Sequence, residues 1–118
     1  MPCLHTHLPC PANSSGLHGA RVVITGRRAA VLEETCAALG AEGVMAHHVA
    51  GDVRKPVDCE QMVSAAVARF GRLDILINCA AGNFLAAAEQ LSPNGFRTVM
   101  EIDAVGVGLV LQLCERIV

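Results

Sequence analysis

The sequence predicts an α/β fold in which a parallel β-sheet is covered by helices on both faces. Short β-branched or apolar runs alternate with longer stretches that repeat apolar residues at helical spacing. Hydrophobic residues make up 53% of the chain and charged residues only 17%. Strands of five or six residues that alternate with helices are typical of βαβ units, whose parallel strands are buried on both faces.

Three strands and three helices are expected after residue 17. The strands are predicted at residues 21–25, 44–49 and 73–77. The first helix is expected over 29–39, with Gly40 as its stop. Asp58 is expected to cap a second helix that Gly71 closes. Ser92 and Pro93 begin the last helix in the favoured Ncap–N1 arrangement, after a loop over 78–91. The apolar face predicted for that last helix consists of Phe96, Val99, Met100, Val107, Val110, Leu111 and Cys114.

Residues 1–16 show no periodicity and are expected to be an irregular tail before a single domain over 17–118. The tail contains four residues of metal-ligating type, Cys3, His5, His7 and Cys10. Zinc ligands are normally held by a hairpin or helix, so an unstructured tail is favoured over a metal site. The six cysteines have spacings unlike a disulfide scaffold, which predicts reduced thiols in an intracellular protein.

Charge and hydropathy exclude several classes of partner. The net charge of −2 gives no electrostatic reason to expect nucleic acid. No apolar run reaches the roughly 18 residues of a membrane span. Binding residues are therefore sought where a parallel sheet binds small ligands, just after the carboxyl ends of the strands. Those segments are 26–28, 51–54 and 78–84.

The third of these segments carries a resemblance. Asn78-Cys79-Ala80-Ala81-Gly82 follows an Asp-Ile-Leu-Ile run and resembles the Asn-Asn-Ala-Gly motif of the short-chain dehydrogenase/reductase family. Residues 71–84, Gly-Arg-Leu-Asp-Ile-Leu-Ile-Asn-Cys-Ala-Ala-Gly-Asn-Phe, resemble the branch of peroxisomal 2,4-dienoyl-CoA reductases more closely still. The resemblance extends over residues 17–118.

The resemblance implies a partial Rossmann-type, doubly wound sheet. It matches the predicted strands to the second, third and fourth of the family, whose spatial order is third, second, first, fourth. The family's first strand, its glycine-rich phosphate loop and its C-terminal half are expected to be missing. Thr25-Gly26 resembles the start of that loop, but residues 27–33 contain no further glycine that would let a pyrophosphate approach.

The resemblance also implies a cofactor site. Arg27 and Arg28 stand where the family selects its nicotinamide cofactor, and a guanidinium pairs with the 2′-phosphate of NADP. NADPH is therefore expected, the alternative being two surface arginines at the start of a helix. Further cofactor contacts are expected from Asp52 and Val53 at the adenine ring, and from Asn78, Ala80 and Gly82. Arg54 and Phe84 are expected near the acyl-CoA, although a solvated arginine is an equal alternative at 54.

Asp103 is the candidate catalytic residue. It follows Val99 by four positions and Phe96 by seven, which places it on the apolar face of its own helix. A carboxylate on such a face costs several kcal/mol unless it is paired or functional. Most members of the family have Asn at this position, whereas the dienoyl-CoA branch has Asp, which the resemblance implies acts with a lysine in proton transfer. The alternative is a helix-surface aspartate.

The leading hypothesis is NADPH-dependent reduction of 2,4-dienoyl-CoA in the β-oxidation of unsaturated fatty acids. It implies a fatty acyl-CoA substrate, a homo-oligomeric full-length protein and a peroxisomal location, with the cytoplasm as the alternative. The chain has no tyrosine and a single lysine, Lys55, so it is expected to be inactive alone. One alternative is another reductase of the family that acts on a ketone or alcohol. The other is a non-catalytic fragment or interaction product.

Overall fold

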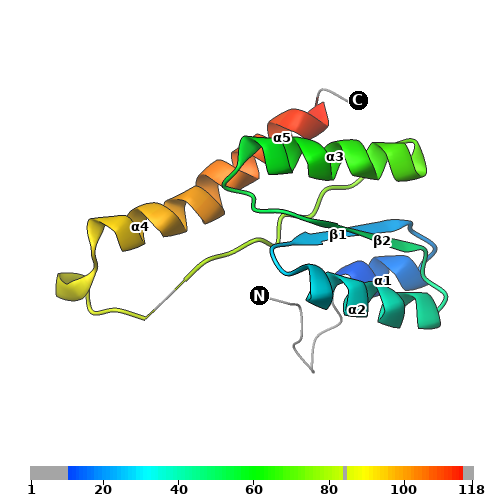
Figure 1. The fold of residues 1–118 in the computed structure, drawn as a ribbon, viewed down its shortest axis with the longest axis horizontal. Coiled ribbons are helices and arrows are strands. Elements are labelled where there is room, and N and C mark those ends of the chain that lie inside the picture. The colour runs from blue at the N-terminus through cyan, green and yellow to red at the C-terminus, as the bar shows by residue number, and fades with distance from the viewer. Residues whose placement is uncertain (1–10, 84, 116–118) are drawn as a thin grey trace.

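The structure, a computed structural model, describes residues 11–83 and 85–115 and has two strands between two layers of helices. The elements in chain order are α1 (Pro11–Leu17), β1 (Val22–Gly26), α2 (Ala29–Ala41), β2 (Ala46–Ala50), α3 (Pro56–Phe70), the 3₁₀ turn η1 (Ala88–Gln90), α4 (Pro93–Met100), the π-helical turn η2 (Glu101–Val105) and α5 (Gly106–Glu115). In Figure 1, α1 and α2 lie on one side of the sheet, and α3 and α5 on the other.

The two strands form a parallel pair, as the sequence predicts. Val22 lies opposite Ala46 and Gly26 opposite Ala50, so the pairing runs through all five positions. The connection between them is α2, and the β1–α2–β2 segment is therefore a βαβ unit. This arrangement confirms the predicted α/β class and brings the carboxyl ends of β1 and β2 to the same edge.

The end of α2 lies beyond its predicted position, whereas the end of α3 agrees with the prediction. Helix α2 continues through Gly40 to Ala41, and the chain turns instead at Gly43, whose φ of 83° suits glycine. The Gly43 amide donates to the Gly40 carbonyl at 3.0 Å. Gly40 adopts no left-handed conformation, so it was wrongly predicted as the stop. Helix α3 ends at Gly71 as predicted, with a φ of 82°.

The start of α3 also differs from the prediction. The helix begins at Pro56, and Lys55 rather than Asp58 is its N-cap residue. Proline is favoured at the first helical position because its missing N–H would be unpaired there anyway. Asp58 lies inside the first turn, where a carboxylate interacts favourably with the helix dipole.

The predicted third strand, 73–77, is not formed. No strand among the described residues pairs with it, and an extended segment without a neighbour cannot form ladder hydrogen bonds. Its side chains nevertheless alternate: Leu76 packs against the core, whereas Ile75 is 71% and Ile77 52% exposed.

The prediction of an irregular segment is wrong for residues 11–16, which belong to helix α1. Packing explains the helix better than local sequence does. Gly16 is buried, and a Cβ atom at this position would overlap the side chain of Val44. Residues 1–10, with the candidate metal ligands Cys3, His5, His7 and Cys10, lie outside the described residues. The division of the chain at residue 17 remains a prediction.

The hydrophobic core has one cluster on the α3 and α5 side of the sheet. Buried Cys59 and Val63 of α3 contact Val110 of α5. Five partly buried residues complete it: Val53, Leu76, Leu109, Leu113 and Cys114. This cluster holds the end of β2, the segment 73–77 and the last helix together.

The last predicted helix begins at the expected residue but is not continuous. Ser92 caps α4 by accepting a hydrogen bond from the Gly95 amide at 3.0 Å. The π-helical turn η2 then separates α4 from α5. A wider turn shifts the helical phase, so the predicted single apolar face is divided. Val110 of α5 is buried, whereas Phe96 and Met100 of α4 remain 58% and 44% exposed.

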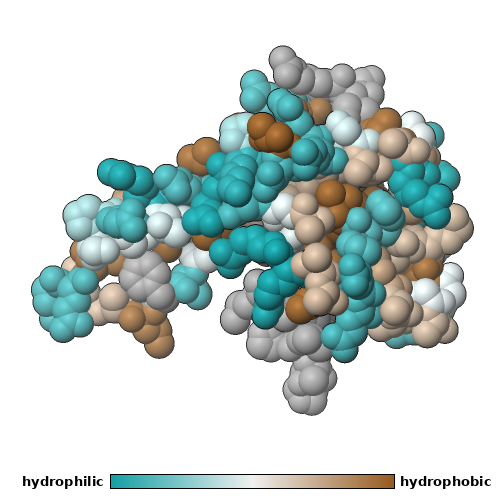
Figure 2. Space-filling model, viewed as in Figure 1, coloured by the Kyte–Doolittle hydropathy of each residue, from teal (hydrophilic) through white to brown (hydrophobic). Residues whose placement is uncertain are grey.

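The segment through η1 and α4 projects from the body of the molecule (Figure 1). The molecule measures 49 × 35 × 22 Å as a result. Figure 2 shows hydrophobic side chains on the surface of this projection. Leu85 and Leu91, on either side of η1, are exposed. No helix of the described residues is long and apolar enough to cross a membrane.

Candidate nucleotide-binding edge

The loops after β1 and β2 lie side by side at the carboxyl edge of the sheet. The Gly51 amide donates to the Gly26 carbonyl at 2.8 Å, which extends the pairing by one step beyond the strands. A Cβ atom at Gly51 would lie 2.6 Å from Met62 Cε, so the glycine lets the loop approach α3 closely. Arg27 and Arg28 follow β1 as exposed side chains, and Asp52 follows β2 as a buried one.

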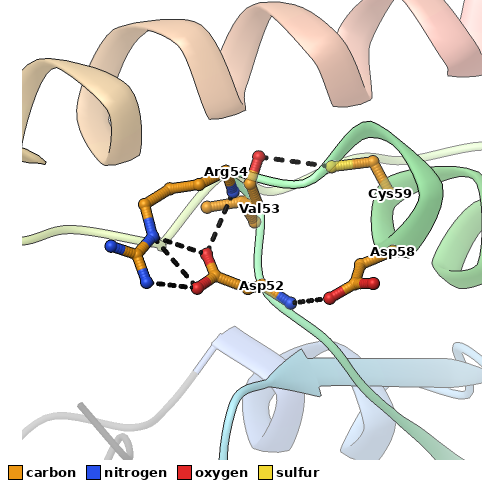
Figure 3. A network of polar contacts seen from close by, with 5 residues as sticks. All are labelled: Asp52, Val53, Arg54, Asp58 and Cys59. Carbon is orange, nitrogen blue, oxygen red and sulfur yellow. Dashed lines mark hydrogen bonds and ion pairs between the residues drawn. The ribbon is translucent and has the colours of Figure 1, made fainter.

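Asp52 and Arg54 form a bidentate ion pair within the loop after β2 (Figure 3). Arg54 Nε lies 3.0 Å from both carboxylate oxygens of Asp52, and Nη2 lies 2.5 Å from Oδ2. The Arg54 backbone amide also donates to Asp52 Oδ1 at 3.0 Å. The loop is therefore folded around the Asp52 carboxylate.

This network shifts the pKa values of both Asp52 and Arg54. The side-chain hydrogen bond from Arg54 lowers the pKa of Asp52 from 3.8 to about 2, against the opposing effect of burial. The charge of Arg27 contributes a smaller lowering, and the 2.8 Å hydrogen bond between Gly51 and Gly26 brings the residues just before Asp52 and Arg27 together. The hydrogen bond that Arg54 donates to Asp52 in turn raises the pKa of Arg54, and the nearby charge of Glu101 adds to it.

The depressed pKa of Asp52 predicts a loss of stability in acid. The ionised carboxylate stabilises the fold fully above its unfolded pKa of 3.8, and this contribution disappears as the pH falls toward the folded value of about 2. The loss should be about 1 kcal/mol by pH 3, reduced further by solvent screening at the partly exposed Arg54. Urea unfolding at pH 7 and pH 3 measures it.

Asp52→Asn should remove this part of the pH dependence, because it has no carboxylate to protonate. Asp74→Asn is the matched control, since Asp74 pairs with Arg72 at the exposed surface. If the Asp52→Asn variant loses as much stability between pH 7 and pH 3 as the unmodified chain, the ion pair contributes nothing.

Two further contacts fix the loop after β2 on the helical layer (Figure 3). The Asp52 amide donates to Asp58 Oδ2 at 2.8 Å, and the Cys59 thiol donates to the Val53 carbonyl at 3.3 Å. Burial, with the nearby charges of Asp58 and Asp52, raises the pKa of the Cys59 thiol, so Cys59 remains a protonated donor. At Gly106, the first residue of α5, a Cβ atom would lie 2.8 Å from Val53 Cγ2.

The third loop, residues 78–82, contacts η2, and the helix α5 that follows η2 contacts the loop after β2. Asn78 and Ala80 are exposed, whereas Gly82 is half-buried and contacts η2. The Gly82 amide donates to Asp103 Oδ1 at 2.9 Å. Asp103 is exposed, and so is Phe96, with which it was predicted to share an apolar face.

The structure therefore brings the predicted site residues together in two groups. Arg27, Asp52 and Arg54 form one group, and Gly82 and Asp103 form the other. Val53, next to Asp52, contacts Gly106 at the start of α5. Among the described residues, no side-chain hydrogen bond connects Asn78 to either group, and Phe84 lies outside the described residues.

Sequence reasoning missed two residues of this site. Asp58 was predicted to cap the helix. An acidic side chain in the first turn of a helix can equally accept a hydrogen bond from the backbone amide of a neighbouring loop. Gly106 was not among the expected site residues, and the signal that could have found it is a glycine inside an apolar helix, where close packing is common.

The described residues contain no cluster of three or more histidine, cysteine, aspartate or glutamate side chains that could hold a metal ion. Cys36, Cys59, Cys79 and Cys114 are free thiols in this part of the chain.

Comparison with known proteins identifies the class. Residues 12–117 match the short chain dehydrogenase family. The chain belongs to this family of oxidoreductases, and its βαβ unit is part of the family's Rossmann-like fold. Solved structures superpose over most of the chain: actinorhodin polyketide ketoreductase with NADPH gives a TM-score of 0.84 at 31% identity, covering 87% of this chain and 40% of that one.

More specific likenesses come from curated relatives. The chain is 58% identical over 91 residues to a peroxisomal 2,4-dienoyl-CoA reductase, (3E)-enoyl-CoA-producing, of Arabidopsis thaliana, covering 77% of this chain and 30% of that protein. It is 43% identical over 99 residues to a probable 2,4-dienoyl-CoA reductase, (2E)-enoyl-CoA-producing, of Bacillus subtilis, covering 83% of this chain and 39% of that protein. A solved short chain dehydrogenase from Bacillus anthracis is 40% identical with a TM-score of 0.83, covering 89% of this chain and 44% of that one. The chain thus spans less than half the length of each of these proteins.

Proposed function

We propose that this chain supplies the nucleotide-binding part of an NADPH-dependent 2,4-dienoyl-CoA reductase. The observation that carries the proposal is the exposed Asp103 carboxylate beside the loop 78–82, at the position where the resemblance implies a proton-transferring aspartate. The likeness to relatives with that name supports the substrate class. The substrate would then be a fatty acyl-CoA of the β-oxidation of unsaturated fatty acids.

The residues at the carboxyl edge fit the adenosine end of the cofactor. Arg27 and Arg28 are exposed cations at the end of β1, suited to a 2′-phosphate, and Asp52 and Val53 lie beside them at the end of β2. Asn78, Ala80 and Gly82 offer a loop of small residues to the rest of the dinucleotide. Residues 27–33 contain no glycine that would let a pyrophosphate approach the start of α2.

The bound cofactor would supply a hydride to the far end of the conjugated diene. The substrate then needs a proton at its α-carbon to become the (3E)-enoyl product. We assign Asp103 to this proton transfer, together with the lysine that the family provides. Arg54 is assigned to the acyl-CoA phosphates, for which it would have to share its guanidinium with Asp52. Phe84 is assigned to the acyl chain.

A graft tests the proposal. The stretch matched over 91 residues would replace its counterpart in the Arabidopsis relative, and the loss of NADPH absorbance would be followed with a 2,4-dienoyl-CoA. We expect turnover that depends on the dienoyl-CoA, with the unmodified relative as the positive control. A graft that folds and binds NADPH but leaves the dienoyl-CoA unreduced would contradict the proposed substrate.

The second candidate is a reductase acting on a ketone, which the likeness to the actinorhodin ketoreductase supports. Turnover of a ketone but not of the dienoyl-CoA by the same graft would favour it.

We also propose a peroxisomal location, which the names of the relatives support, and a homo-oligomeric full-length protein.

A further inference from the structure

Two arginines and a phenylalanine form a cluster at the amino edge of the sheet, the edge opposite the loops described above. Arg21 precedes β1, and Phe70 ends α3, which runs back across the sheet from the carboxyl edge (Figure 1). The guanidinium carbons of Arg21 and Arg69 each lie 5.6 Å from the centroid of the Phe70 ring. Both distances are within the range of a cation–π contact. One aromatic ring thus holds two positive charges near each other.

The two backbone segments that carry this cluster are fixed by hydrogen bonds. The Val22 amide donates at 2.9 Å to the carbonyl of the residue that precedes β2, so the strand pairing begins directly after Arg21. The Gly71 amide donates to the Val67 carbonyl at 2.7 Å, and its φ of 82° ends α3 directly after Phe70. The ring and the Arg21 backbone are therefore held by two different elements of the fold.

The charge of this cluster is not balanced within the part of the chain that the structure describes. The ion pairs of that part involve Arg54 and Arg72 instead. Its side-chain hydrogen bonds likewise use no N–H group of Arg21 or Arg69. The carbonyl end of α3 supplies about half a negative charge, against two full positive ones. The two exposed guanidiniums therefore repel each other and have free donors.

A phosphate group matches this cluster in charge and in hydrogen bonding. A guanidinium that lies over a ring uses its face for the cation–π contact and leaves its in-plane N–H donors for an anion. Such donors bind phosphate oxygens in pairs. The positive charge is also confined to one place, because the adjacent Arg72 is paired with Asp74. A small anion with two negative charges fits this arrangement better than an extended anionic surface does.

We propose that Arg21 and Arg69, held by the Phe70 ring, form a binding site for a soluble phosphate compound at the amino edge of the sheet. The site is separate from the nucleotide-binding edge, because β1 lies between Arg21 and Arg27 and spans about 20 Å at roughly 3.3 Å per residue. It does not depend on the proposed reductase activity. A phosphate bound to both arginines would link the start of β1 to the end of α3 and stabilise the folded chain.

NMR titration of the 118-residue chain with inorganic phosphate, at constant ionic strength, tests the site. The Nε–Hε signals of Arg21 and Arg69 should shift along one saturable curve. Arg21→Gln should weaken the phosphate affinity about tenfold, the lower end of the effect of removing a charge-assisted hydrogen bond. Arg69→Gln should have the same effect, and the double variant should show no saturation. Arg97→Gln is the matched control, because Arg97 is an exposed arginine of α4, and it should leave the affinity unchanged.

Phe70→Leu keeps an apolar side chain at the end of α3 but removes the ring, so it should also weaken the phosphate affinity severalfold. The Gly51 amide, bonded to the Gly26 carbonyl, reports whether each variant keeps the fold. An affinity that Phe70→Leu leaves unchanged would show that the ring does not organise the site, contrary to the proposal.

Three other outcomes would overturn the proposal. The first is a linear response of the Arg21 and Arg69 signals that equals the response of Arg97, which would show an adventitious ion only. The second is an affinity that neither Arg21→Gln nor Arg69→Gln reduces. The third is binding of the chain to phosphatidylglycerol vesicles without any response to free phosphate, which would make the cluster a membrane contact.

Discussion

Replacing Arg27 by aspartate in the graft should reverse its cofactor preference from NADPH to NADH. Arg27 is exposed at the end of β1 and near enough to Asp52 to lower its pKa, so it lies at the edge where the adenosine end is expected. Loss of a charge-assisted hydrogen bond to the 2′-phosphate should reduce kcat/KM with NADPH by about 10- to 100-fold. An aspartate would also repel the phosphate and could accept from the 2′-hydroxyl of NADH.

Steady-state rates with the two cofactors measure this change. Arg21→Asp is the matched control, because it alters the charge equally at the opposite end of β1, where Arg21 lies over the Phe70 ring at 5.6 Å. The control should leave the cofactor ratio unchanged. An unchanged ratio in Arg27→Asp itself would show that this arginine does not select the cofactor.

The isolated 118-residue chain should have no reductase activity and should self-associate. It has no tyrosine and a single lysine, and its segment after β1 lacks the glycines of a pyrophosphate loop. Ile75 and Ile77 are exposed on an extended segment without a partner strand, and unpaired strand edges with apolar side chains favour association. Mixing the chain with NADPH and a 2,4-dienoyl-CoA should leave the NADPH absorbance constant.

Sedimentation measures the association. The double substitution Ile75→Lys and Ile77→Lys should shift the chain toward monomer, because both side chains are solvent-exposed and the core residue Leu76 is untouched. If this variant associates as strongly as the unmodified chain, the cause lies elsewhere. Turnover by a soluble monomer would contradict the prediction of inactivity.

The βαβ unit could be predicted because its signals are local. β-branched runs, helical spacing and Gly71 each depend on neighbouring residues, and the pairing of β1 with β2 follows from one crossover. The segment 73–77 has an equally clear pattern but no neighbour in space, and a strand exists only as one member of a pair. Its apolar sequence therefore could not reveal whether it would form a strand.

One feature of the candidate site could be predicted from the sequence, and two could not. The proximity of Arg27 to Asp52 follows from the rule that parallel strands end at one edge. The environment of Asp103 does not follow from spacing, because the π-helical turn η2 interrupts the regular helix on which the prediction depends. The Asp52–Arg54 ion pair depends on loop conformation, which residues two positions apart do not determine.

The connectivity of the core has a consequence for the order of folding. From β1 to α3, each element contacts its neighbours in sequence, so this part can form with short loop closures. The cluster of Cys59, Val63 and Val110, by contrast, joins α3 to α5 across the whole segment through α4. Closing that long loop costs more chain entropy. We therefore expect β1 through α3 to form first, and the restraint that α5 places on Val53 and on the loop 78–82 to arrive last.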